Sequence, residues 1–211
     1  MLPLRPEMNP EEVKILERCV RLFMRYGVKS VTMDDVAREL GISKKTLYLY
    51  FSNKNDLVNK VTEFHFVQEN QAMCALSGQS KNAIDEMLNM SRWISTQMTG
   101  INPVLIYDLR KHHPEAWQLF VSHRNTEIYQ SIYNNIKRGI AEGLYREDLH
   151  VEIITRSYIG RMEVVIDPEI FPPGSFSFQE IHREFILYHL RGVASKKGLQ
   201  YLEKIQNQLY A

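Results

Sequence analysis

The stretch that decides the fold of this chain is GISKKTLYLYF, residues 41–51. Its glycine, Gly41, follows a run of helical character, and glycine readily adopts the left-handed conformation that ends a helix. Ser43 then offers a hydroxyl that can cap a second helix. In that helix Leu47 and Phe51 stand four residues apart and share one face, which we expect to pack into the core.

The remaining side chains of this short helix are cations, a hydroxyl, phenols and one aliphatic group. They are Lys44, Lys45, Thr46, Tyr48, Leu49 and Tyr50. Groups of these kinds reach phosphates and base edges in the major groove of DNA. For Tyr48 an alternative stays open, because its ring can pack while its hydroxyl reaches outward.

The segment before Gly41 also has the pattern of a short helix. Thr32 and Asp35 form a near-match to a capping box at its start. Its apolar side chains recur at intervals of three and four residues, at Met33, Val36, Ala37 and Leu40. A helix, a turn with glycine and a second helix make a helix-turn-helix, whose second helix enters the major groove.

These motifs together resemble the tetracycline-repressor (TetR-type) family of transcriptional regulators. The resemblance runs in one register from Ile15 to about Val58. It is carried by LF at 22–23, YG at 26–27, VTMDDVA at 31–37, GIS at 41–43, TLY at 46–48, Phe51, Lys54 and Leu57. It implies an all-α fold, with a three-helix DNA-binding domain followed by a larger helical domain for ligand binding and dimerisation.

The resemblance also implies roles in binding double-stranded DNA. Side chains at the start of the second helix, from Ser43 through Lys44 and Lys45 to Thr46, point into the groove, where lysine suits guanine. Tyr48 and Tyr50 donate to phosphates, and Leu49 contacts a thymine methyl. Thr32 and Lys54 fix the position of the backbone. The family often has a small residue where Lys45 stands and a histidine where Tyr50 stands, so the operator sequence does not carry over.

The distribution of charge along the chain adds modest support for DNA binding by the N-terminal region. The chain has 211 residues and a formal net charge of +1, but residues 1–60 hold 11 basic and 8 acidic residues, against 15 and 17 in the remainder. The basic excess therefore coincides with the helix-turn-helix, as expected for DNA binding. Two cysteines make no disulfide framework. We expect Cys19 to be a buried thiol, whereas Cys74 leaves redox sensing open.

The N-terminal region has no signal-peptide pattern and no run reaches the ~18 apolar residues of a membrane span, so a cytoplasmic protein is expected. Residues 1–9 read as a loose arm. A first helix is predicted over 10–26, with Asn9 as its cap. A fourth helix is predicted from 54 to about 74, before a Ser- and Gly-rich break at 77–81.

Later segments also have helical periodicity. They are residues 82–99, 103–112, 114–142, 151–166, 178–195 and 199–209. We therefore predict an arm and helix-turn-helix over 1–53, a linking helix over 54–74 and a ligand-binding and dimerisation domain over 75–211. Asp148 is the expected cap of the 151–166 helix. The loop at 167–177 either covers a pocket mouth or simply crosses between two helices.

The larger domain is expected to hold a small apolar or amphipathic ligand. Large, soft or aromatic side chains suit an adaptable pocket, although each one alone is more often core. The candidates are Met87, Met90, Trp93, Met98, Tyr107, Trp117, Phe120, Tyr129, Tyr133 and Met162.

A homodimer is expected, because a two-fold protein reads two half-sites of a palindrome. The helices at 151–166 and 178–195 are the predicted interface, unless their faces only close the monomer core. The small residues there, which permit close approach, are Gly160, Gly192 and Ala194. The larger residues, which offer apolar surface, are Ile181, Phe185, Tyr188 and Leu190.

Two other classes of protein stay open. An enzyme lacks support, because there is no phosphate-binding loop or paired catalytic carboxylates, and the histidines lack metal-ligand spacing. We therefore expect no catalytic residue, metal or cofactor. A helical adaptor that keeps the motif as a scaffold would not bind DNA, which the cations at 44, 45 and 54 argue against. The favoured function is a repressor released by an inducer, with a regulator gated by its abundance as the alternative.

Overall fold

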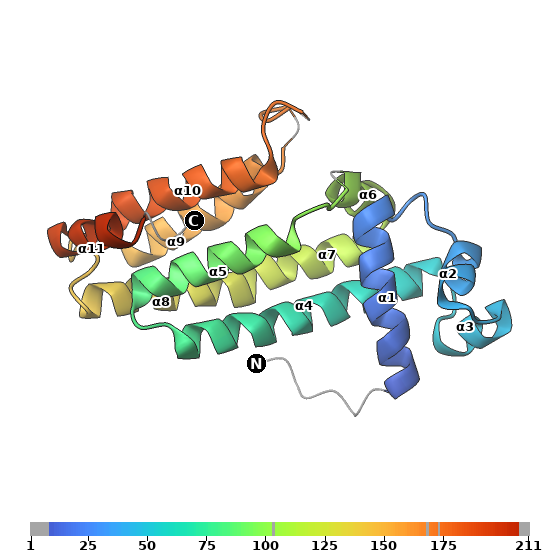
Figure 1. Ribbon diagram of the computed structural model, residues 1–211. Coiled ribbons are helices and arrows are strands. Elements are labelled where there is room, and N and C mark those ends of the chain that lie inside the picture. The colour runs from blue at the N-terminus through green and yellow to red at the C-terminus, as the bar shows by residue number, and fades with distance from the viewer. Residues whose placement is uncertain (1–8, 103, 168, 173, 207–211) are drawn as a thin grey trace. The chain divides into compact units, whose positions relative to one another are not determined.

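The structure is a computed structural model that describes residues 9–102, 104–167, 169–172 and 174–206. Across these residues the regular structure is helical, apart from one isolated antiparallel bridge between Tyr145 and Ala194 (Figure 1). The prediction of an all-α fold is confirmed. The predicted N-terminal arm, except Asn9, and the last predicted residues of the C-terminal helix lie outside the described ranges.

The described chain forms two compact units. The first contains residues up to Glu69 together with residues 100–122, and the second contains 70–99 and everything from His123 onward. This grouping differs from the domain boundary expected at residue 75, because residues 100–122 pack with the N-terminal helices. Helix α4, Lys54–Gln79, is the continuous element that belongs to both units.

The first unit is built on the helix-turn-helix. Its other helices are α1 (Pro10–Tyr26), α2 (Met33–Leu40), α3 (Lys44–Tyr50), α6 (Val104–His112) and most of α7 (Pro114–His123). The predicted bounds of the first helix are confirmed, and the Asn9 side chain caps it by accepting the Glu11 N–H at 2.9 Å. Cys19 lies in the core, and burial raises the pKa of its thiol to about 12, which makes it a poor nucleophile.

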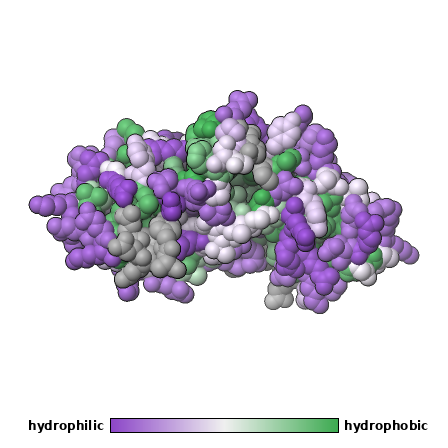
Figure 2. Space-filling view, turned by 45° about the horizontal axis from the view of Figure 1, so that its top comes forward, coloured by the Kyte–Doolittle hydropathy of each residue, from purple (hydrophilic) through white to green (hydrophobic). Residues whose placement is uncertain are grey.

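The second unit contains the later helices. They are α5 (Ala83–Gln97), α8 (Tyr129–Ala141), α9 (Val151–Val165), α10 (Phe178–Val193) and α11 (Lys196–Gln206). A π-helical turn, Arg124–Ile128, joins the end of α7 to α8, so helical structure runs without a break over most of the helix predicted at 114–142. In Figure 2 hydrophilic side chains dominate the face in view, with hydrophobic patches between them.

Helix α4 is longer than the sequence suggested. The predicted break at 77–81 begins too early, since α4 continues through Ser77 and Gly78 and ends within that stretch, at Gln79. Tertiary hydrogen bonds are made by the last turn of α4 and by the residue that follows it. The Ser77 hydroxyl donates to Glu86 at 2.5 Å, and Arg138 donates to the Ser80 carbonyl at 2.9 Å. These bonds tie the end of the helix to α5 and α8.

A buried polar network connects α5 and α8. The Glu86 carboxylate accepts from Asn135 at 3.0 Å and from Arg138 at 3.2 Å. The Tyr145 hydroxyl donates to Asn135 at 3.1 Å, and burial raises the pKa of this phenol. Glu86, Asn135 and Tyr145 are buried with these partners, which makes the network a specific tie between the helices.

One predicted cap is wrong. Asp148 does not cap α9, because the His150 ring accepts the Ile153 N–H at 3.4 Å instead.

Two other histidines, His182 and His189, are buried in α10, and burial lowers the pKa of each to about 4. Among the described residues no group of three or more His, Cys, Asp or Glu side chains could hold a metal ion. No described helix is long and apolar enough to cross a membrane.

The close approach of Tyr145 to Gly139 gives a test of the second unit. A Cβ at residue 139 would overlap the Tyr145 ring, so Gly139→Ala should lower the free energy of unfolding by about 1–3 kcal/mol through overpacking. Gly78→Ala is the matched control, since a Cβ there meets open space within α4 and should stabilise by about 0.5–1 kcal/mol. Urea unfolding measures both, and equal effects would contradict the packing explanation.

Candidate nucleic-acid interface

The turn of the helix-turn-helix has the predicted geometry. Thr32 and Asp35 form a complete capping box, in which the Thr32 hydroxyl accepts the Asp35 N–H at 3.1 Å and the Asp35 carboxylate accepts the Thr32 N–H at 3.0 Å. Hydrogen bonds donated to the Asp35 carboxylate by the Thr32 hydroxyl and then by the Thr32 N–H lower the pKa of Asp35. Gly41 ends α2 at φ 67°, and its N–H donates to the Ala37 and Arg38 carbonyls. A side chain with a Cβ would be strained at this angle.

Helix α3 begins at the predicted cap. The Ser43 hydroxyl accepts the Thr46 N–H at 3.0 Å and lies 2.8 Å from the Thr46 hydroxyl. Leu47 and Phe51 are buried, which confirms their assignment to the core. The opposite face is open, with Tyr48 49% exposed and Leu49 75% exposed. Both side chains are therefore open to solvent on the side of α3 that faces away from the core.

The two lysines at the start of α3 are also exposed. The Lys44 ammonium lies 2.6 Å from the Asp34 carboxylate of α2, and more than half of each side chain is exposed to solvent. An ion pair this exposed contributes little to stability. Lys44, Lys45, Tyr48 and Leu49 therefore form an outward face of α3, which we call the reading face.

Tyr50 differs from its neighbours. Its ring is partly buried, packs against the core of the first unit and lies 6.3 Å from the Phe51 ring in a tilted arrangement. Its carbonyl accepts a hydrogen bond from the Lys60 ammonium at 2.8 Å. Tyr50 therefore contributes to the support of α3, in contrast to the exposed Tyr48.

Lys54 is likewise engaged inside the protein. Its ammonium donates to the Lys29 carbonyl at 3.1 Å, and burial lowers its pKa, an effect that the nearby Asp108 carboxylate opposes. Asp108 itself, on α6, accepts the Lys29 N–H at 2.9 Å. The turn between α1 and α2 is thus held by α4 on its carbonyl and by α6 on its N–H.

Sequence reasoning missed Asp108 and Lys60 as supports of this motif. Asp108 lies 79 residues from Lys29, and no local pattern links positions so far apart. Lys60 lies in the predicted linking helix over 54–74. The partner that its side chain reaches is a backbone carbonyl, which every residue has, so no residue type in the sequence marks that partner.

The predicted pocket residues do not form one group. Tyr107, Trp117 and Phe120 belong to the first unit, where Trp117 stacks on Phe120 at 5.0 Å and Tyr107 is largely exposed. Met87 and Met90 are buried in the second unit. The remaining candidates are partly buried in the second unit. They are Trp93, Met98, Tyr129, Tyr133 and Met162.

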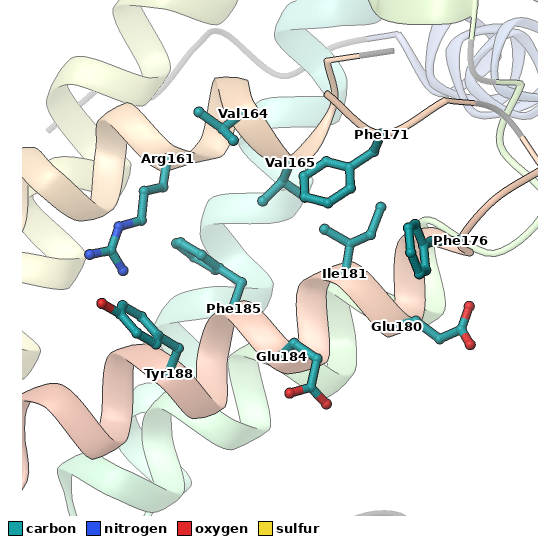
Figure 3. A pocket seen from close by; sticks show the side chains of 10 residues that line it. All are labelled: Arg161, Val164, Val165, Phe171, Phe176, Glu180, Ile181, Glu184, Phe185 and Tyr188. Carbon is teal, nitrogen blue, oxygen red and sulfur yellow. The ribbon is translucent and has the colours of Figure 1, made fainter. Parts of the chain in front are cut away.

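A groove with a volume of about 540 Å³ lies between α9 and α10 (Figure 3). None of the predicted pocket residues lines it. Arg161 and Tyr188 lie at one end of the groove, and Glu180 and Glu184 lie at its edge. The walls are mainly aromatic and aliphatic side chains, which are Val164, Val165, Phe171, Phe176, Ile181 and Phe185. Phe171 and Phe176 of the 167–177 loop line this groove, which favours the pocket-mouth interpretation of that loop.

The predicted interface residues divide into two sets. Ile181 and Phe185 line the groove, Tyr188 is 68% exposed, and Gly160 and Gly192 are exposed. For Leu190 and Ala194 the predicted interface role is wrong, because both side chains are buried in the second unit and offer no surface. Leu190 faces inward on α10, whose other side carries Tyr188, and Ala194 is the cap residue that follows the helix.

Comparison with known proteins identifies the motif. The family model described as "Bacterial regulatory proteins, tetR family" matches residues 15–61, which run from within α1 through α2 and α3 into the start of α4. The helix-turn-helix regulator YvaF of Bacillus subtilis is 29% identical over 185 residues, covering 86% of this chain and 95% of YvaF.

Two further proteins match over most of their length. The repressor KstR2 of Mycolicibacterium smegmatis is 23% identical, covering 93% of this chain and 96% of the repressor. The structure of FadR from Bacillus subtilis in complex with stearoyl-CoA has a TM-score of 0.68 at 16% identity, covering 86% of this chain and 99% of FadR. These proteins are named as regulators of transcription, which points away from an enzyme. The helix-turn-helix of this chain thus matches the tetR family model, and the chain is similar over most of its length to DNA-binding regulators of transcription.

Proposed function

We propose that this protein is a homodimeric repressor that binds a near-palindromic operator and is released by a small apolar or amphipathic ligand. The observation that carries the proposal is the reading face of α3, which is exposed on a helix held firmly at both ends. The lysines at 44 and 45 suit guanine, the Tyr48 hydroxyl suits a phosphate, and Leu49 suits a thymine methyl. Thr32, Ser43 and Thr46 lie beside this face at the helix starts.

Selection of random duplexes on the purified protein should yield a palindromic consensus whose binding weakens steeply with salt. Lys44→Ala should weaken binding to that duplex by about 1–3 kcal/mol and reduce the salt slope by about 1, because a cation leaves the interface. Lys204→Ala, an exposed lysine of α11, is the control and should leave both unchanged. No enriched sequence and no binding at low salt would favour the adaptor or enzyme alternatives.

The groove between α9 and α10 supports the dimer. Phe176, Tyr188 and Val164 expose apolar surface around it, and solvated apolar patches of this kind are commonly association sites. Arg161 lies over the Tyr188 ring at 5.0 Å, while Glu184 stands at the edge of the same groove. In a two-fold interface the same patch meets itself, so a patch with both signs of charge can be self-complementary.

Tyr188→Glu should therefore convert the dimer into a monomer. Losing a buried tyrosine anchor costs about 2 kcal/mol or more, or roughly thirtyfold in the dimer dissociation constant. Sedimentation velocity measures the change. Tyr107→Glu, at an exposed aromatic of the first unit, serves as the control and should stay dimeric. A Tyr188→Glu protein that remains a full dimer would contradict this choice of interface.

The ligand part of the proposal draws on the relatives. FadR is described in complex with stearoyl-CoA, which is an amphipathic ligand. Partly buried aromatic and methionine side chains of the second unit, such as Trp93, Tyr129 and Met162, offer lining of the same character. Helix α4 has residues in both units, so a ligand that bends or shifts α4 would also move the helix-turn-helix that carries the reading face.

Stearoyl-CoA is the first probe for release. Added in excess over the protein, it should weaken operator binding at least tenfold, which requires a preference of about 1.4 kcal/mol for the released state. Coenzyme A without the acyl chain is the control and should have no effect. Equal DNA affinity with and without acyl-CoA of every chain length would favour a regulator gated by its abundance.

A further inference from the structure

Lys60, two turns into α4, extends to the end of the recognition helix. Its ammonium donates to the Tyr50 carbonyl at 2.8 Å, lies 3.5 Å from the Glu12 carboxylate of α1 and sits 5.1 Å above the Phe51 ring. Its side chain is 35% exposed, and that of Glu12 is 20% exposed. One cation thus connects three helices within the first unit, and its charge is balanced internally.

Helix α3 needs such a partner. It has seven residues, and isolated helices of that length are unstable in water. Its last carbonyls have no partner within the helix, and its last turn contains no basic side chain that could reach them. A cation at a helix C-terminus is favourable because the helix dipole is negative there. Lys60 supplies from α4 what the sequence of α3 lacks.

We propose that Lys60 is a positioning residue that sets the pose of α3 against α1 and α4 and makes no contact with DNA. This inference rests on the proposed DNA-binding function and adds a residue that supports the reading face from behind. The three surrounding groups use the ammonium, so it is not free to neutralise a phosphate. Its effect is on how well the reading face fits one sequence, since a shifted helix misplaces every base contact together.

The test compares two numbers for each variant, measured with the full-length protein. The first is the affinity ratio between the selected duplex and a scrambled duplex of the same length. The second is the slope of affinity against salt. Lys60→Met keeps the aliphatic stem and should reduce the ratio about tenfold, with a slope equal to that of the natural protein. Lys45→Met, at an exposed lysine of α3, is the matched control and should reduce the slope by about 1.

Lys60→Gln provides the second variant, because its amide can still donate to the Tyr50 carbonyl but carries no charge. It should keep more of the affinity ratio than Lys60→Met and the same salt slope, and it stands in should Lys60→Met fail to fold in thermal unfolding. A slope reduced by about 1 with an intact ratio, in either variant, would make Lys60 a phosphate contact and overturn the proposal. Unchanged values for both variants would also overturn it.

The natural protein, measured on the same two duplexes, separates this inference from the function beneath it. If the natural protein shows no preference between the duplexes, both the DNA-reading function and the role of Lys60 fail. If it shows the preference and the Lys60 variants keep that preference, only the role of Lys60 fails.

Discussion

The constraint on which the first unit depends is the shortness of α3. Seven residues cannot hold a helix by their own hydrogen bonds, so each part of this helix is fixed from outside. The left-handed Gly41 and the Ser43 cap set its start, two buried side chains, Leu47 and Phe51, hold its middle and end, and Lys60 binds its last carbonyl. What remains free is the reading face.

The distribution of lysines shows why net charge is a poor guide to DNA contacts. Lys54 and Lys60 are engaged with backbone carbonyls inside the first unit, whereas Lys44 and Lys45 are exposed on α3. Half of these four cations therefore support the fold of the motif. The basic excess of the N-terminal region was a correct indication of where the motif lies, but not of which side chains reach outward.

Local signals in the sequence were sufficient for the helix-turn-helix. Asn9, Thr32, Gly41 and Ser43 act through partners within five residues, so propensity and spacing predicted them. Features that depend on distant partners were beyond the same reasoning. The end of α4 is bonded to Glu86 and Arg138, which lie far along the chain, and Leu190 turns inward because of how α10 packs. The candidate pocket residues share a chemical character, but character alone does not bring side chains together.

The contacts that hold the helix-turn-helix in place are made largely to backbone atoms. Lys54 binds the carbonyl of residue 29, Asp108 binds the N–H of the same residue, and Lys60 binds the carbonyl of residue 50. Backbone groups are the same whatever side chain is present. Substitutions on the exposed face of α3 can therefore accumulate without disturbing the support beneath it. A single scaffold of this kind can acquire new operator sequences over evolution while its stability is preserved.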